Sequence, residues 1–309
     1  MKKNQKTLIA LASVFVLILA LWIIVLLTGR ESEVQPPADT AAPTVSDRDY
    51  DDVTALRVTS DSENLSFVRH NGIWKLEDQP DFPLDQNTVS EMANAISRLK
   101  AHRAMTSSEV DLESAGLRSP RFTVEISYTD GDAFSYYIGN ENKTLDGLYL
   151  METYSGKVYL VDSSLADYFN VSRMTLAELD TVPDATAVRK ITVSGPSGEK
   201  VYESDADGRF SAWQSLEFLA AADFAPDEET LASYSLTEDS RTAVTVEYTV
   251  TTQVESSEQS ADLKFDTDHT AVIYIGAVCK QSPSYTYASL AGSGLVCLIR
   301  TDLASLLTE

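Results

Sequence analysis

Cysteine is scarce in this sequence of 309 residues, which contains only Cys279 and Cys297. Two cysteines cannot build the framework of several bridges that stabilises small secreted domains, so the fold must rest on apolar cores. In an oxidising compartment the pair could form one disulfide. The alternative is that both are small apolar side chains on neighbouring strands, and their spacing does not decide between these two readings.

Histidine is also rare, and no signature of a known catalytic or metal centre is present. The three histidines, His70, His102 and His269, fall in separate segments without the H-E-x-x-H spacing of a zinc site. No G-x-S-x-G sequence marks a nucleophilic serine. The glycines of the GSG segment (292–294) precede a strand pattern, whereas a phosphate cradle precedes a helix. We therefore expect a protein that is not an enzyme, with no catalytic residue, no metal site and no cofactor.

Two short acidic clusters are weak candidates for a cation site. The DADG segment (205–208) has Gln214 where an EF-hand loop needs its last glutamate, so we interpret it as a turn. The DTDH segment (266–269) is richer in oxygen ligands, but it lies in a polar stretch that favours a solvated loop.

Basic residues are few compared with acidic ones. The sequence has 24 Lys and Arg against 47 Asp and Glu, which gives a formal net charge of −23. Such a field repels phosphate backbones, so nucleic acid is not expected as a partner. A solvated acidic surface that keeps the protein soluble is the simplest interpretation. Binding of cationic partners or cations is the alternative.

Charge is absent from one long run, Leu8–Leu27, which is apolar except for Ser13. Twenty such residues predict an uncleaved transmembrane helix that anchors the protein in the cytoplasmic membrane. The basic flank MKKNQK places the N-terminus in the cytoplasm and the bulk of the chain outside. A cleaved signal peptide is the alternative, but the run is long and no A-x-A-like site follows it.

The remaining chain predicts a stalk and two α+β lobes. Residues 1–30 form the cytoplasmic tip and anchor, and residues 31–52, rich in Pro, Ala and acids, form a flexible stalk. Residues 53–172 alternate like strands, with Asn71-Gly72 as a hairpin turn and one apolar stripe typical of a helix over 84–100.

Residues 173–309 repeat this pattern. Asp207-Gly208 stands where Asn71-Gly72 stood, SAWQSLEFLAAADF (211–224) supplies the helix, and VCLIRTDLASLL (296–307) repeats VYLVDSSLADYF (158–169). An unmatched polar insertion lies near 251–270. The expected fold class is therefore α+β: an N-terminal transmembrane helix followed by two tandem homologous lobes, each a mainly antiparallel sheet with one packed helix and a short terminal helix.

The motifs of the first lobe resemble a known family. The strand pair ending in G-I-W-K-L (72–76), the segment DLESAGLRSP (111–120) and the strand ending in I-G (138–139) are similar to the bacterial envelope family known as domain of unknown function number 4340. The resemblance implies a membrane-tethered extracytoplasmic subunit associated with ABC-type or gliding-type transport. It carries over no catalytic residues.

Tyrosine is the one abundant residue with binding potential. Tyr136 and Tyr137 are adjacent in a strand, so they point to opposite faces, and Tyr149 corresponds to Tyr287 in the second lobe. Packing within the sheets is one interpretation, and a tyrosine-lined face for glycan or peptide is the other.

We expect a non-enzymatic accessory or scaffold subunit of an envelope or ABC-type transport complex, with permease components as partners. The alternatives are a module that binds or senses cell-wall glycan or peptide, and an unrecognised hydrolase.

Overall fold

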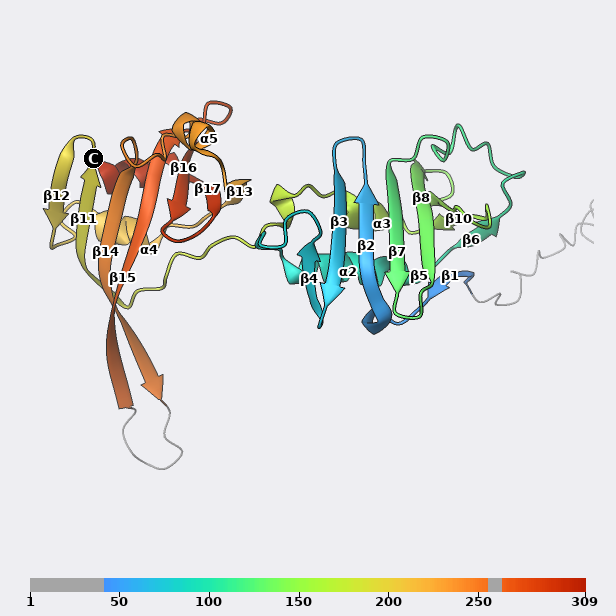
Figure 1. The fold of residues 1–309 in the computed structure, drawn as a ribbon, viewed down its shortest axis with the longest axis horizontal. Coiled ribbons are helices and arrows are strands. Elements are labelled where there is room, and N and C mark those ends of the chain that lie inside the picture. Colours follow the sequence, from blue (N-terminus) through green and yellow to red (C-terminus); the bar gives the residue numbers. More distant parts are fainter. Residues whose placement is uncertain (1–41, 255–262) are drawn as a thin grey trace, which may run out of the picture. The chain divides into compact units, whose positions relative to one another are not determined.

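The structure is a computed structural model that describes residues 42–254 and 263–309. Two large antiparallel sheets and one sheet of two strands contain its strands (Figure 1). The first large sheet has eight strands in the spatial order β4-β3-β2-β7-β8-β9-β10-β6. Its strands are β2 (Val53–Thr59), β3 (Asn64–His70), β4 (Ile73–Leu76), β6 (Arg103–Met105), β7 (Phe122–Tyr128), β8 (Ala133–Asn142), β9 (Gly147–Glu152) and β10 (Val158–Val161).

Helix α2 (Gln86–Ser97) forms because a capping residue precedes a regular apolar stripe. The Asp85 carboxylate accepts hydrogen bonds from the backbone N–H groups of Asn87 and Thr88 at 2.9 and 3.2 Å. The stripe is fully buried and packs against β2, β4 and β7; its members are Val89, Met92, Ala93 and Ile96. The short helix α3 (Leu165–Phe169) packs beside α2.

The segment before the first sheet is ordered, which corrects the expected extent of the stalk. Strand β1 (Thr44–Asp47) pairs with β5 (Arg98–Lys100), and a 3-10 turn, η1 (Tyr50–Asp52), follows. Composition alone placed these residues in a flexible region because they include few large apolar side chains. The segment is nevertheless ordered, because the Tyr50 ring packs against the core of the first sheet. Residues 31–41 of the expected stalk lie outside the described residues.

The second large sheet has seven strands in the order β12-β11-β14-β15-β16-β17-β13. This order equals that of the first sheet without β4, as a duplication would produce. Its strands are β11 (Ala187–Gly195), β12 (Gly198–Tyr202), β13 (Ala220–Phe224), β14 (Thr242–Val254), β15 (Leu263–Val278), β16 (Tyr285–Leu290) and β17 (Leu295–Arg300). The shorter elements of this region are η2 (Met174–Leu176), α4 (Arg209–Gln214), α5 (Glu228–Ser233) and α6 (Thr301–Thr308).

The helix expected over residues 211–224 is wrong in its extent. Helix α4 ends at Gln214, and residues 220–224 form β13 instead. The edge of β17 explains the difference, because β13 pairs with it and the Leu219 N–H donates to the Leu298 carbonyl at 2.9 Å. Tertiary pairing here outweighs local helix propensity. Asp207-Gly208 likewise leads into α4 rather than into a strand, so the second sheet has no counterpart of β4.

Strands β14 and β15 extend beyond the rest of the second sheet as a two-stranded ribbon, which we call the arm (Figure 1). The arm comprises Thr251–Val254 and Leu263–Thr270 among the described residues. Its strands are paired with each other from Thr251↔Asp266 to Val254↔Leu263. The DTDH segment lies in this arm as part of β15, which corrects the expectation of a solvated loop.

The expected fold class needs correction in its helices. Among the described residues the sheets are antiparallel and combined with helices, as an α+β fold requires, but the second lobe has only the short helix α4 where a full packed helix was expected. Among the residues that the structure describes, no helix combines the length and the apolar character needed to cross a bilayer. The span expected at Leu8–Leu27 lies outside those residues.

Candidate functional site

The four tyrosines singled out in the sequence do not share one environment. Tyr136 faces the helix-covered side of the first sheet and is 1% exposed, and burial raises the pKa of its phenol well above 10. Tyr137 and Tyr149 are half-buried and pack against a separate small cluster. The members of that cluster are Met105, Ala115, Leu117, Val158 and Leu160. Tyr136 is therefore a core residue, and Tyr137 and Tyr149 lie on the second face of the sheet.

The D-L-E-S-A-G-L turn (111–117) holds this second face in place. The Asp111 carboxylate accepts a hydrogen bond from the Glu113 N–H at 3.1 Å. Gly116 takes a positive φ of 69°, which costs glycine little. The Asn140 N–H then donates to the Ala115 carbonyl at 2.8 Å. The carbonyl sits over Gly139, at the irregularity of β8, where a side chain would clash with it.

The second sheet repeats this turn with different residues. The Ala277 N–H donates to the Tyr234 carbonyl at 2.7 Å, and that oxygen lies over Gly276. Ser235 has a φ of 56° in the place of Gly116. The two glycines of the I-G motif therefore have the same physical role, which is to let a loop carbonyl approach the strand backbone closely.

A cleft of about 460 Å³ opens beside Tyr149 on the second face of the first sheet. The Tyr149 hydroxyl accepts a hydrogen bond from the Asn142 side-chain amide at 2.6 Å. Glu109, at the same cleft, has a lowered carboxyl pKa because the backbone N–H and the hydroxyl of Thr106 both donate to it. The lining contains Arg103 and Lys143 as well as carboxylates, so both signs of charge are present. Such a surface can offer hydrogen bonds to a polar ligand, but it brings no nucleophile and base together.

The corresponding position in the second sheet is filled by aromatic packing. The rings of Tyr287 and Tyr234 lie with their centroids 4.3 Å apart. The Tyr234 hydroxyl donates to the Asp223 carboxylate at 3.2 Å, and the Tyr287 hydroxyl donates to the Cys279 sulfur at 3.4 Å. Sequence reasoning missed Tyr234 and Asp223 as neighbours of Tyr287. The alignment of the 229–236 segment with the D-L-E-S-A-G-L turn was the signal that could have found Tyr234.

The two cysteines are free thiols, so the disulfide considered for them is not formed. Cys297 lies on β17 in the core, where burial and the nearby charge of Asp180 raise its pKa to about 12. The hydrogen bond from Tyr287 lowers the pKa of the Cys279 thiol. For Cys297, the interpretation as a small apolar side chain in a strand matches its buried position.

The acidic clusters also have structural partners. Asp266 and Asp268 accept hydrogen bonds from the hydroxyls of Thr251 and Thr249, across the two strands β14 and β15. Asp205 accepts from the N–H groups that begin α4, including that of Phe210 at 2.7 Å. Within the described ranges, no group of three or more His, Cys, Asp or Glu side chains is placed to hold a metal ion.

Comparison with known proteins gives one match. No curated protein and no solved structure matches the chain. The model of the family described as "Domain of unknown function (DUF4340)" matches residues 74–209, which contain Trp74, the D-L-E-S-A-G-L turn and Gly139. The resemblance inferred from these motifs is confirmed by this match: residues 74–209 are similar to the DUF4340 family.

Proposed function

We propose that this protein is a non-enzymatic accessory or scaffold subunit of a cell-envelope complex, associated with ABC-type transport. The single observation that carries the proposal is the arm of β14 and β15. A two-stranded ribbon has little stability of its own in water. A ribbon that extends beyond its sheet therefore favours a function in which another protein pairs with it.

The arm has two free strand edges in its described part. The ladder between β14 and β11 reaches only to Thr249, and the Thr251 N–H is already satisfied by the Thr186 hydroxyl. The ladder between β15 and β16 begins at Ile273. The backbone groups between these limits can accept a further strand, which is the recognition mode called strand addition. Phe265, 55% exposed on the arm, offers an apolar contact to such a partner.

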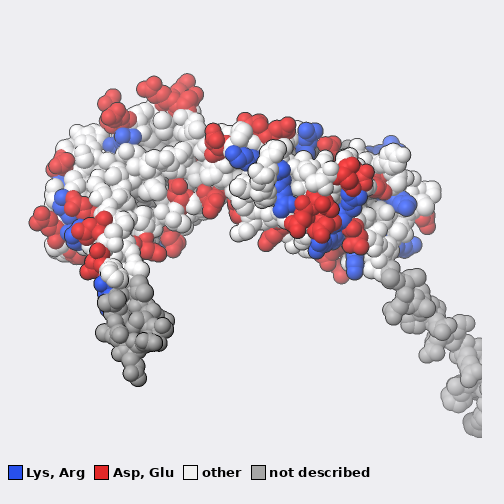
Figure 2. All heavy atoms as spheres, turned by 60° about the horizontal axis from the view of Figure 1, so that its bottom comes forward, with Lys and Arg blue, Asp and Glu red and all other residues white. Residues whose placement is uncertain are grey.

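The surface around the arm constrains the partner. Acidic side chains are spread over the visible face of both large sheets and are interspersed with basic ones (Figure 2). On the arm itself, Asp266 and Lys264 carry opposite charges, and Asp268 forms an ion pair with Arg189 at 3.0 Å. The net charge of the chain, −23, favours a docking strand with neutral or basic side chains over an acidic one.

The ordered segment before the first sheet supports a scaffold function, in which the protein holds its folded part in place. Because β1 and η1 are fixed to the first lobe, the chain that leads to Leu8–Leu27 leaves from a defined point. We propose that the apolar segment Leu8–Leu27 associates with the cytoplasmic membrane and that the folded part acts outside the cytoplasm. Protease added to intact spheroplasts then digests the folded part, whereas its protection until lysis would contradict this localisation.

Co-purification tests the scaffold proposal. The full chain is isolated from its own membranes in detergent without crosslinker, beside a variant in which residues 252–265 are replaced by Asn-Gly. Thr251 and Asp266 are paired directly, so a two-residue turn can join them. We expect permease or ATPase components to copurify in stoichiometric amounts with the full chain and to be lost from the variant. Tyr154→Ala, at a residue 99% exposed outside the arm, is the control and keeps the partner.

The proposal fails if the arm variant, folded with an unchanged melting temperature, retains the same components. It fails equally if the full chain brings down no transport component.

The cleft beside Tyr149 favours a second candidate function, the binding of cell-wall glycan or peptide. In a pull-down with purified glycan strands, the full chain should be retained and Tyr149→Ala should be lost. Tyr154→Ala again serves as the control. Equal retention of Tyr149→Ala would exclude this cleft as the binding site.

A further inference from the structure

The two repeats place the same backbone turn over their sheets but carry different side chains on it. The Ala115 carbonyl lies over Gly139, and the Tyr234 carbonyl lies over Gly276. Each carbonyl accepts a hydrogen bond from the N–H group of the residue after that glycine, at 2.8 and 2.7 Å. Ala115 and Tyr234 are therefore equivalent positions of the duplication.

The strand registers make two further pairs of residues equivalent. Strands β10 and β17 both contain the sequence V-x-L. Tyr149 and Tyr287 lie opposite the leucine of that sequence, in the neighbouring strands β9 and β16. Met105 and Asp223 lie opposite its valine, in the strands β6 and β13 on the other side.

The side chains at these positions touch one another in the second repeat but leave an open cleft in the first. The ring of Tyr234 packs against Tyr287, with the centroids 4.3 Å apart, and its hydroxyl donates to Asp223 at 3.2 Å. The alanine in the first repeat has no ring that could fill this space. The three equivalent residues all line the cleft of about 460 Å³; they are Ala115, Tyr149 and Met105.

The lining of the cleft specifies the kind of group that fits. The thioether of Met105 stands where the second repeat has the Asp223 carboxylate, and methionine sulfur contacts aromatic rings favourably. Leu145, 44% exposed, adds an apolar side chain to the lining. Apolar contacts accompanied by exposed charged side chains are typical of protein docking sites. The charged residues include Arg103, Glu109 and Lys143.

We propose that this cleft binds an aromatic side chain of a partner protein, which takes the place that the Tyr234 ring has in the second repeat. The partner's ring packs against Tyr149, and its edge contacts Met105. Phenylalanine fits best, because Met105 offers no carboxylate where Asp223 accepts the hydroxyl of Tyr234. The assignment rests on the second candidate function, a ligand at this cleft, and names that ligand as a protein side chain rather than a glycan.

The methyl group of Met105 provides a direct readout. The full chain is studied by NMR in detergent micelles with its five methionines labelled at the ¹³C-methyl group. Met105→Leu identifies the signal of interest. An aromatic ring that lies on a methyl group shifts its proton signal upfield, whereas a sugar has no ring current. The probes are N-acetylphenylalanine amide, N-acetylcyclohexylalanine amide, whose ring is saturated, and the tetramer of N-acetylglucosamine.

We expect the phenylalanine probe to shift the Met105 signal upfield with saturation. The cyclohexylalanine probe should bind about 2- to 10-fold more weakly, which is the part that an aromatic pair adds beyond its buried area. Ala115→Tyr supplies the missing ring from the chain itself, so the probe should no longer bind. Ala133→Tyr, the same substitution at an exposed alanine where β8 begins, is the control and leaves the affinity unchanged.

Three results would overturn the proposal: no saturable upfield shift with the phenylalanine probe, equal binding of the cyclohexylalanine probe, or unchanged binding in folded Ala115→Tyr. Saturable binding of the glycan probe without the phenylalanine probe would reject the aromatic ligand and keep the second candidate function. Binding of none of the probes would reject both. The comparison of the probes uses the unmodified chain, so it remains decisive even if Ala115→Tyr does not fold.

Discussion

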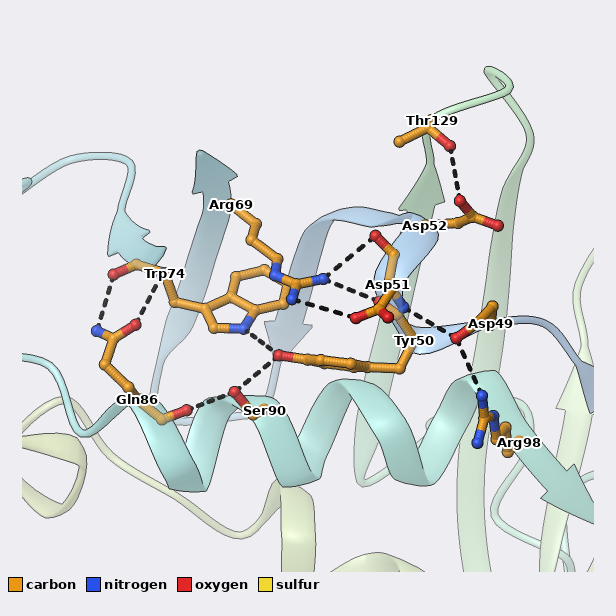
Figure 3. A network of polar contacts seen from close by, with 10 residues as sticks. All are labelled: Asp49, Tyr50, Asp51, Asp52, Arg69, Trp74, Gln86, Ser90, Arg98 and Thr129. Carbon is orange, nitrogen blue, oxygen red and sulfur yellow. Dashed lines mark hydrogen bonds and ion pairs between the residues drawn. The ribbon is translucent and has the colours of Figure 1, made fainter. Parts of the chain in front are cut away.

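The indole Nε1 of Trp74 donates a hydrogen bond to the Tyr50 hydroxyl at 3.2 Å, and this contact fastens the start of the folded chain to the first sheet (Figure 3). The Tyr50 hydroxyl donates in turn to Ser90 on α2 at 2.8 Å. Gln86, also on α2, bonds to both the N–H and the carbonyl of Trp74. The Trp of the family motif therefore joins a strand, a helix and the N-terminal segment.

Removal of the Tyr50 hydroxyl should weaken this connection. Tyr50→Phe leaves the buried Trp74 N–H without an acceptor, so we expect a loss of about 1–3 kcal/mol in the free energy of unfolding. Urea denaturation measures the loss, and limited proteolysis should cut earlier within residues 44–52. Tyr154→Phe, at an exposed ring, should change neither quantity. Equal stability of Tyr50→Phe and the unmodified protein would show that the hydrogen bond contributes nothing net.

The glycines under the two turn carbonyls should be intolerant of a side chain. An alanine Cβ at Gly139 or Gly276 would lie less than 3.0 Å from a backbone oxygen, which cannot rotate away. We expect each substitution to cost about 1–3 kcal/mol, the usual range for overpacking. Both variants are compared by urea denaturation.

Ser235→Gly, in the turn that lies over Gly276, should change the free energy of unfolding in the opposite direction. Ser235 has a positive φ, which glycine adopts with less strain. We expect it to gain about 0.5 kcal/mol, the balance of relieved strain and lost chain entropy. If Gly139→Ala were as stable as the unmodified protein, the close approach of the Ala115 carbonyl could not be the reason for the I-G motif.

Local signals in the sequence were enough to place several elements. Asn71-Gly72 predicted a hairpin turn and has φ angles of 52° and 81°, which few residues other than Asn and Gly adopt together. The apolar stripe over 84–100 predicted a helix, and α2 (Gln86–Ser97) lies within that range, begun by the cap at Asp85. In both cases the determining interactions involve residues within four positions of each other, so the sequence contains them directly.

Non-local contacts decided the features that the sequence did not predict. Residues 220–224 have an apolar pattern that suits a helix, but they form a strand because their backbone pairs with the edge of β17. The ring of Tyr287 packs against Tyr234, whose hydroxyl donates to Asp223, and both of these residues lie more than 50 positions earlier in the chain. A pocket in the region of the second sheet is lined by a connecting segment, 179–185, and by residues 213–218 at the end of α4. No sequence motif includes both segments, so the sequence did not predict this pocket.

The cap of α2 should make stability depend on pH in a defined direction. Hydrogen bonds from the Thr88 hydroxyl and from the N–H groups of Thr88 and Asn87 hold the pKa of the Asp85 carboxyl below its ordinary value. A lowered folded-state pKa means that the contribution is fully present above the unfolded value, about 3.9, and is lost as the pH falls through the folded-state pKa.

We therefore expect Asp85→Ala to cost about 0.5–2 kcal/mol in the free energy of unfolding at pH 7. The difference from the unmodified protein should narrow as the pH is lowered below 4. Urea titrations at a series of pH values measure it, with Asp61→Ala as the control for the loss of an exposed carboxylate. A difference that stays constant or grows in acid would contradict the cap as its source.

The two thiols should differ in reactivity because their surroundings shift their pKa values in opposite directions. The Tyr287 hydroxyl stabilises the thiolate of Cys279, whereas burial and the charge of Asp180 disfavour the thiolate of Cys297. Thiolate is the species that iodoacetamide alkylates. Both thiols are buried, with Cys279 4% and Cys297 0% exposed, so the difference in thiolate stability decides the order of reaction. We expect Cys279 to be alkylated first in the folded protein and Cys297 only after unfolding in urea.

Tyr287→Phe tests the cause. Loss of the hydroxyl raises the pKa of Cys279, so its alkylation at pH 7 should slow by about 3- to 10-fold, and the midpoint of its pH–rate profile should move upward. Peptide mass spectrometry follows each cysteine separately, and Cys297→Ala should leave the rate at Cys279 unchanged. Faster alkylation of Cys279 in Tyr287→Phe would show that the Tyr287 hydroxyl hinders access to the sulfur more than it stabilises the thiolate. If neither thiol of the unreduced, unfolded protein were alkylated, a bridge between Cys279 and Cys297 would have to exist, against the free thiols of the structure.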